Sequence, residues 1–111
     1  MEIDFGQNMK SLDKKTVLEE GPEGKKEPMT LRYVSIMSLM YIDQQHKIGG
    51  PEKMKRYSLA LKIQDTKDPV KVDAANIVLL KEVIGDIYGP LVVGQAYKML
   101  EQEGDKPPEG K

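Results

Sequence analysis

Few residues of this chain could carry out catalysis, because its 111 residues include a single histidine, His46, and no cysteine. A Ser-His-Asp triad would have to use His46, which stands near the expected end of a helix, next to Lys47. An exposed histidine at that position stabilises the negative end of the helix dipole. One histidine without cysteine also argues against a zinc site with the usual ligands. We therefore predict no catalytic residue, no metal site and no cofactor.

Two further motifs contain residues that bind ions in other proteins. Asp65, Asp68 and Asp73 lie close together but lack the glycine and glutamate spacing of a calcium loop. The segment 49–53, Gly-Gly-Pro-Glu-Lys, lacks the buried strand and the spacing of a phosphate-binding loop. We interpret both motifs as turns and helix ends.

A group of basic residues falls within the expected second helix and is the best candidate for an anion or nucleic-acid patch: Lys53, Lys55, Arg56 and Lys62. The whole chain is nearly neutral, with 17 basic and 18 acidic side chains and a formal net charge of -1. A protein that coats DNA carries a basic surface instead. We therefore expect a solvated helix face here, and nucleic-acid binding is the less favoured alternative.

These residues are positioned by an α-rich domain that spans residues 30–103. Thr30 is the expected N-cap of a first helix over 31–45, and Pro51 begins a second helix that ends near residue 63. Asp73 caps a third helix, and Gly89-Pro90 separates it from a fourth, which Gly104 ends. The predicted fold is mainly α (α+β), with four helices and a short N-terminal β hairpin or extended arm.

The N-terminal arm, residues 1–29, has a different composition. Residues 1–5 alternate apolar and acidic side chains, as a short strand does, and 16–18 form a second β-capable segment. Residues 19–28 contain two glycines and two prolines and predict a loop. Residues 70–72 could add a strand to the arm. The tail, residues 104–111, has nothing to bury and is expected to be disordered.

The apolar residues of the helices exceed what a small body needs for its own core. Residues 33–42 are apolar nearly all round, which is typical of a central helix or of one that a partner covers. In the second helix, Met54, Tyr57, Ser58 and Leu61 share one face. The third helix directs Ile77, Leu80, Ile84 and Ile87 inward, and the fourth directs Val93, Ala96, Tyr97 and Leu100.

We expect the surplus to form a surface that binds protein, another copy of this chain included, because methionine and tyrosine suit adaptable contacts. The alternative is that these side chains simply fill the core. The predicted interface residues are Met37, Met40, Tyr41, Tyr88, Leu91 and Val92.

The location of the protein follows from what the sequence lacks. Cysteine is absent, as is common in a reducing compartment, and no apolar leader follows Met1. No apolar run approaches the roughly 20 residues of a membrane span. We expect a cytoplasmic homo-oligomer that does not enter a membrane.

The segment 88–101, Tyr-Gly-Pro-Leu-Val-Val-Gly-Gln-Ala-Tyr-Lys-Met-Leu-Glu, resembles the C-terminal part of small uncharacterised proteins encoded by tailed bacteriophages and prophages. The resemblance extends to the general plan from Thr30 onward. It implies expression in an infected bacterial host and carries no catalytic residues.

The resemblance and the absence of a catalytic set together favour a non-enzymatic protein-binding module. A phage assembly factor or chaperone is the first expectation. The alternatives are an inhibitor of a host defence or metabolic complex and a nucleic-acid-binding regulator.

Overall fold

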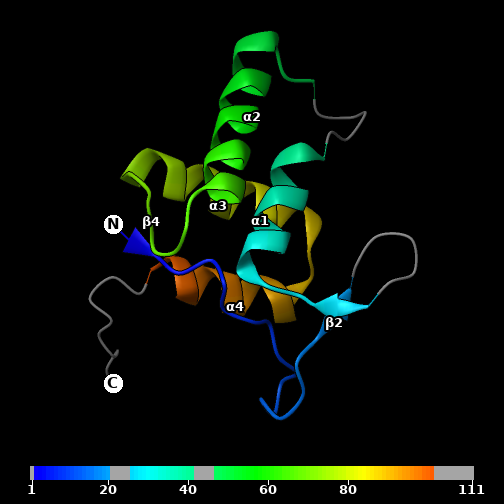
Figure 1. The fold of residues 1–111 in the computed structure, drawn as a ribbon. Helices are drawn as coiled ribbons and strands as arrows, with labels where there is room; N and C mark the ends of the chain where they lie inside the picture. The colour runs from blue at the N-terminus through cyan, green and yellow to red at the C-terminus, as the bar shows by residue number, and fades with distance from the viewer. Residues whose placement is uncertain (1, 21–25, 42–46, 102–111) are drawn as a thin grey trace.

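The computed structural model describes residues 2–20, 26–41 and 47–101, and it confirms a mainly α fold with short N-terminal strands. Four helices make up most of the body: α1 (Leu31–Met40), α2 (Gly50–Asp65), α3 (Ala74–Ile87) and α4 (Pro90–Leu100). Helix α1 packs against both α2 and α3, and α4 packs on α3 (Figure 1). The described residues end at Glu101. The disorder predicted for the tail, residues 104–111, therefore falls outside them.

The helix ends follow the chemistry of their caps. The Thr30 hydroxyl accepts a hydrogen bond from the Tyr33 amide at 3.1 Å, and the Asp73 carboxylate accepts one from the Asn76 amide at 2.9 Å. Pro51 and Pro90 lie in the first turns of α2 and α4, where a missing N–H costs nothing. Helix α1 ends at Met40, earlier than the predicted residue 45, and Tyr41 is already extended.

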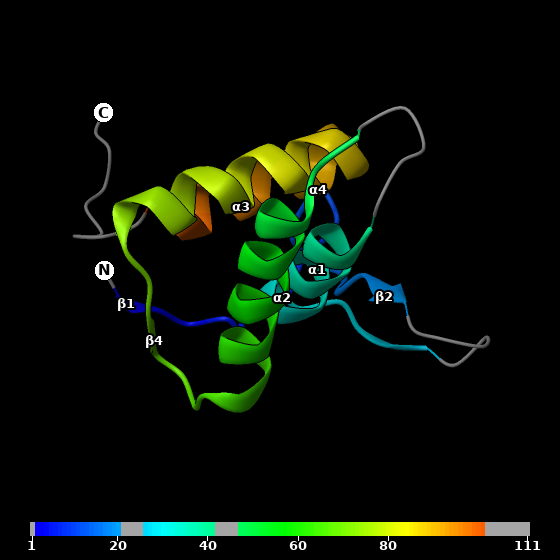
Figure 2. The same ribbon diagram turned by 90° about the horizontal axis from the view of Figure 1, so that it is seen from above.

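The N-terminal arm pairs with the helical region. Strand β1 (Glu2–Ile3) pairs antiparallel with β4 (Val70–Lys71), as expected for residues 70–72. A separate hairpin joins β2 (Glu19–Glu20) to β3 (Glu27–Pro28). The prediction of a loop over 19–28 is therefore wrong at its two ends, which form the hairpin strands; residues 21–25 lie outside the described part. The two small sheets lie on opposite sides of α1 (Figure 2).

One core holds the arm and the helices together. Ile3, Phe5 and Met9 of the arm are completely buried in the same cluster as Leu31, Ile63 and the inner residues of α3 and α4. The three segments around Met9, Leu18 and Met29 also bond to one another: the Met9 amide donates to Met29, Leu18 to Met9, and Met29 to Leu18. Burial and backbone bonds thus make the arm part of the folded body.

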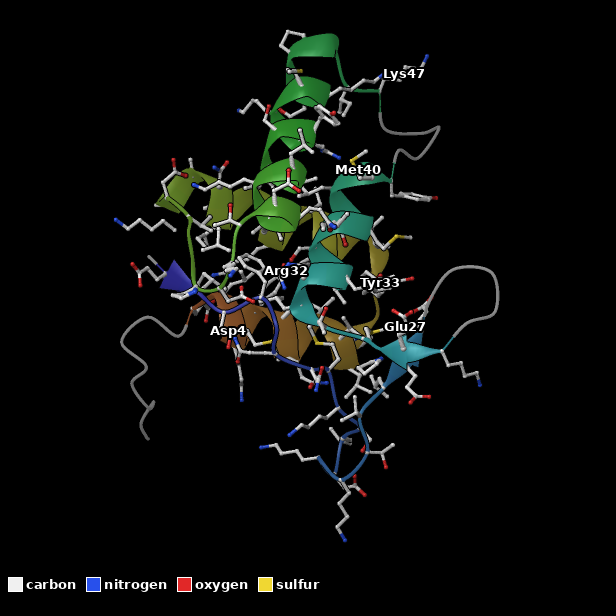
Figure 3. The ribbon with its side chains drawn as sticks, viewed as in Figure 1. Asp4, Glu27, Arg32, Tyr33, Met40 and Lys47 are labelled. Carbon is white, nitrogen blue, oxygen red and sulfur yellow. The ribbon has the colours of Figure 1, made fainter. Side chains whose placement is uncertain are left out.

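Arg32 joins three elements at the first turn of α1 (Figure 3). Its guanidinium donates to the carbonyl of Ile63 at the end of α2 and lies 2.9 Å from the carboxylate of Asp68. The same carboxylate oxygen accepts the Phe5 amide at 2.7 Å, and the Phe5 carbonyl accepts the Arg32 amide. The arm, α1 and the segment before β4 are thereby held in one arrangement.

Helices α3 and α4 approach closely at a glycine. A Cβ atom at Gly85 would lie 2.9 Å from the Tyr97 hydroxyl, which donates to the carbonyl of Lys81 at 2.8 Å. The Lys81 ammonium lies over the Tyr97 ring and pairs with Glu101. Because position 85 has no side chain, Tyr97 can reach α3 and hold the two helices together.

Candidate functional site

The outer face of α1 is the most apolar surface among the predicted site residues. At 100° per residue, four side chains at spacing i, i+3, i+4 and i+7 share this face. We call them the α1 stripe: Tyr33, Ile36, Met37 and Met40. Met37 is 47% exposed and Met40 is 52% exposed, and Tyr41 next to them is also exposed. All three are predicted interface residues, and the structure leaves them exposed.

The inner face of the same helix is less apolar than its outer face. Leu31, Val34 and Leu39 are buried against α2 and α3, and so are Ser35 and Ser38. Both serine hydroxyls are buried without a hydrogen-bond partner in the described part of the chain. A buried hydroxyl without a partner opposes folding. Helix α1 therefore buries two hydroxyls among its inner apolar residues and keeps large apolar groups on its outer face.

A groove of about 490 Å³ lies against the first three residues of the α1 stripe and stops short of Met40. Tyr33, Ile36 and Met37 supply its apolar side chains. One wall is the β2–β3 hairpin with Glu20 and Glu27, and the other includes Arg32 and Gln64, from the start of α1 and the end of α2. Figure 3 shows Tyr33 on the side of α1 next to the hairpin strand that carries Glu27, and Met40 at the far end of the helix. The arrangement is an apolar groove with an acidic wall.

Two tyrosines lie beside the acidic wall. Burial, and then the negative charge of Glu20, raise the pKa of Tyr88 to about 12. The same two causes raise the pKa of Tyr33 above its usual value. Both rings are half-buried and pack against the core. Tyr88 was predicted as an interface residue, and the structure gives it a partly structural position between the core and Glu20.

The prediction for α4 needs a correction at Val92. The buried face of this helix consists of Val92, Ala96 and Leu100, so Val92 belongs to the core and is not available to a partner. These three residues follow the spacing i, i+4 and i+8. The buried face is therefore rotated from the predicted one, and Val93 and Tyr97, which were expected to point inward, are half-buried. Leu91 is exposed at 37%, but it does not line the groove.

A second apolar face was identified in the sequence but not counted as an interface. Met54, Tyr57, Ser58 and Leu61 again follow the spacing i, i+3, i+4 and i+7, and we call them the α2 stripe. The buried residues of α2 are Leu59, Ala60 and Ile63, which lie on the opposite side. Met54 is 59% exposed, and the first turns of α2 project beyond the other elements (Figure 1).

The four basic residues predicted as an anion patch do not form one surface. Lys55 and Lys62 line the same depression on α2, together with Met54, Ser58 and Asn76. Lys53 is about 200° around the helix from Lys55. Arg56 is half-buried and its guanidinium lies 3.3 Å from Glu52, which is also 4.0 Å from the Lys55 ammonium. This division reduces the positive potential that nucleic acid would meet.

The remaining polar motifs have structural roles where the structure describes them. Asp68 binds Arg32 and the Phe5 amide, and Asp73 caps α3. His46 lies outside the described residues. Within 2–20, 26–41 and 47–101, no three acidic or histidine side chains converge as a metal site requires. None of the helices in those ranges is long and apolar enough to cross a membrane.

The comparisons with known proteins give no relative from which a role could be transferred. No protein-family model matches the chain, and no curated protein and no solved structure matches it either.

Proposed function

We propose that this chain is a non-enzymatic protein-binding module and that the α1 stripe, in its groove, is the binding surface. The observation that carries the proposal is the exposure of large apolar side chains on α1, whose inner face mixes Leu31, Val34 and Leu39 with two serines. Its outer face holds Ile36, Met37 and Met40, while its inner face holds two serines without hydrogen-bond partners in the described residues. Folding of the described residues buries part of Ile36 but leaves about half of Met37 and Met40 in water.

The physical argument rests on the cost of leaving the stripe in water. Full burial of one large apolar side chain contributes about 1.5–3 kcal/mol, and half of Met37 and half of Met40 remain to be buried. The spacing of the stripe matches the contact face of a helix that packs against another helix. Methionine side chains adapt to the shape of the group they meet. A helical segment of another chain would therefore fit this surface.

Within this class, we favour an assembly factor or chaperone for virion parts, acting in the cytoplasm of an infected bacterium. The support is the resemblance of residues 88–101 to small phage proteins. An inhibitor of a host complex would use the same surface, so the identity of the bound chain separates the two roles. The divided basic residues of α2 make a nucleic-acid regulator the least supported alternative.

A photo-crosslinker tests the surface directly. We would replace Met37 with p-benzoylphenylalanine, express the variant in bacteria, irradiate the cells and look for covalent adducts with protein chains. The control places the same group at Val78 on α3, which is 57% exposed and outside the groove. We expect adducts at position 37 and none at position 78. Equal adducts at both positions, or none at 37, would contradict the proposal.

A further inference from the structure

Two mostly apolar helix faces of this chain stay partly or largely exposed within the described fold, and they share one geometry. The α1 stripe and the α2 stripe both repeat at i, i+3, i+4 and i+7. Each lies opposite the buried face of its own helix. Residues at this spacing form the ridge with which one helix packs into the groove of another. The residue spacing of each stripe would therefore allow it to pack against the other stripe on a second copy of the chain.

The charges beside the two stripes are opposite in sign. The groove of the α1 stripe carries Glu20 and Glu27 on its hairpin wall, while the cation on its other wall, Arg32, is neutralised by Asp68. The α2 stripe is flanked on one side by Lys62 and by Lys55, and Lys55 is only partly offset by Glu52 at 4.0 Å. Lys53 lies toward the other side. An α2 stripe in the groove would bring lysines to carboxylates and bury apolar side chains on both helices.

The same charges oppose the symmetric alternatives. Two antiparallel α2 stripes would bring the Lys55 and Lys62 side of one helix against the same side of its partner. Two grooves facing each other would bring Glu20 and Glu27 against their own copies. Juxtaposed like charges disfavour an interface. One arrangement avoids both of these repulsions. In it, the α2 stripe of one copy lies in the groove of another copy.

We propose that a second copy of this chain occupies the groove, through its α2 stripe. The inference rests on the proposed function, since it names the chain that the α1 stripe binds. Each copy then has one groove and one α2 stripe, and the contact is head-to-tail. Head-to-tail contacts occupy every groove and every α2 stripe only when the copies form a closed ring or a filament without ends.

Mixing two variants that each lack one side of the contact gives the sharpest test. Met37→Glu places a charge in the groove, so this variant can bind only through its α2 stripe. Met54→Glu places a charge in the α2 stripe, so this variant can bind only through its groove. Both positions are about half exposed, so both variants should fold, which circular dichroism verifies. By light scattering over a concentration series, we expect an oligomer for the native chain, a monomer for each variant alone, and a dimer for their equimolar mixture. A symmetric contact would give no such dimer.

Charge reversal gives an independent test. We expect Glu20→Lys with Glu27→Lys to weaken association about tenfold, and the addition of Lys55→Glu with Lys62→Glu to the same chain to restore it. The matched control, Glu2→Lys with Glu82→Lys, changes the net charge equally at exposed positions outside the groove. The control should associate as the native chain does.

The outcomes separate this inference from the proposed function. A native chain that stays monomeric, or a mixture of variants that stays monomeric, overturns the head-to-tail contact. If crosslinking at position 37 then yields an adduct with a different protein, the protein-binding function stands and only the identity of the occupant is wrong. The absence of any adduct at position 37 overturns the function itself.

Discussion

The inner and outer faces of α1 differ in composition less than burial alone would select. The inner face contacts α2 and α3 and includes two serines, whereas the outer face includes Ile36, Met37 and Met40. The two serines inside are small, whereas the exposed halves of Met37 and Met40 outside bury nothing in the described fold. Helix α1 thus makes one set of contacts within the fold, and its outer face carries the surface proposed above for a second set.

The largest expected effect on stability comes from comparing alanine substitutions at two neighbouring residues, one on each face of α1. Leu39 is buried and Met40 is half-exposed. We expect Leu39→Ala to lower the free energy of unfolding by about 3 kcal/mol, because it leaves a cavity between the helices. Met40→Ala should lower it by less than about 0.5 kcal/mol. Urea denaturation of the two variants measures both values, and equal losses would show that the outer face is part of the core.

Arg32 lies at the boundary between the faces and provides the next effect. Its guanidinium bonds to a carbonyl at the end of α2 and to Asp68. We expect Arg32→Ala to reduce the free energy of unfolding by about 2 kcal/mol, because charged hydrogen bonds are lost at a partly buried site. Arg32→Lys keeps the charge but loses the forked geometry, so its midpoint in urea should fall between those of the native chain and the alanine variant.

The serines of the inner face give an effect of opposite sign. Ser35 and Ser38 are buried without hydrogen-bond partners among the described residues, and alanine favours the helix more than serine does. We expect each Ser→Ala change to raise the free energy of unfolding by about 1 kcal/mol. Thermal unfolding of the single and double variants checks this. A decrease would mean that each hydroxyl finds a partner in solution.

The smallest expected effect comes from the tyrosines beside the groove and appears only at high pH. The pKa of Tyr88 is raised to about 12 in the folded chain, above the ordinary value of 10. The contribution of its neutral form to stability is thus fully present below pH 10 and is lost as the pH rises through 12. Tyr88→Phe should flatten the decline in stability over this interval and remove the last step of the tyrosinate absorbance titration. A loss of tyrosinate absorbance at about pH 10 instead would place Tyr88 in water.

The sequence predicts the elements of this fold better than it predicts which faces they bury. Thr30 and Asp73 identify two helix starts because capping is local chemistry, and residues 70–71 pair with the arm as expected. Val92 was misplaced because Val92 and Val93 lie 100° apart on α4, and only packing against α3 selects between them. The groove depends on the hairpin, whose strands lie in a segment rich in glycine, proline and charge. No local pattern there indicates pairing.

The side-chain amide of Gln95 on α4 protects one strand edge of the N-terminal arm from pairing with another chain. It accepts the Lys10 amide at 2.8 Å and donates to the Lys10 carbonyl at 2.7 Å, so a side chain fills both bonding positions that a neighbouring strand would use. An open strand edge invites the addition of a foreign strand and, with it, aggregation. Gln95 closes that edge at Lys10 without a further strand.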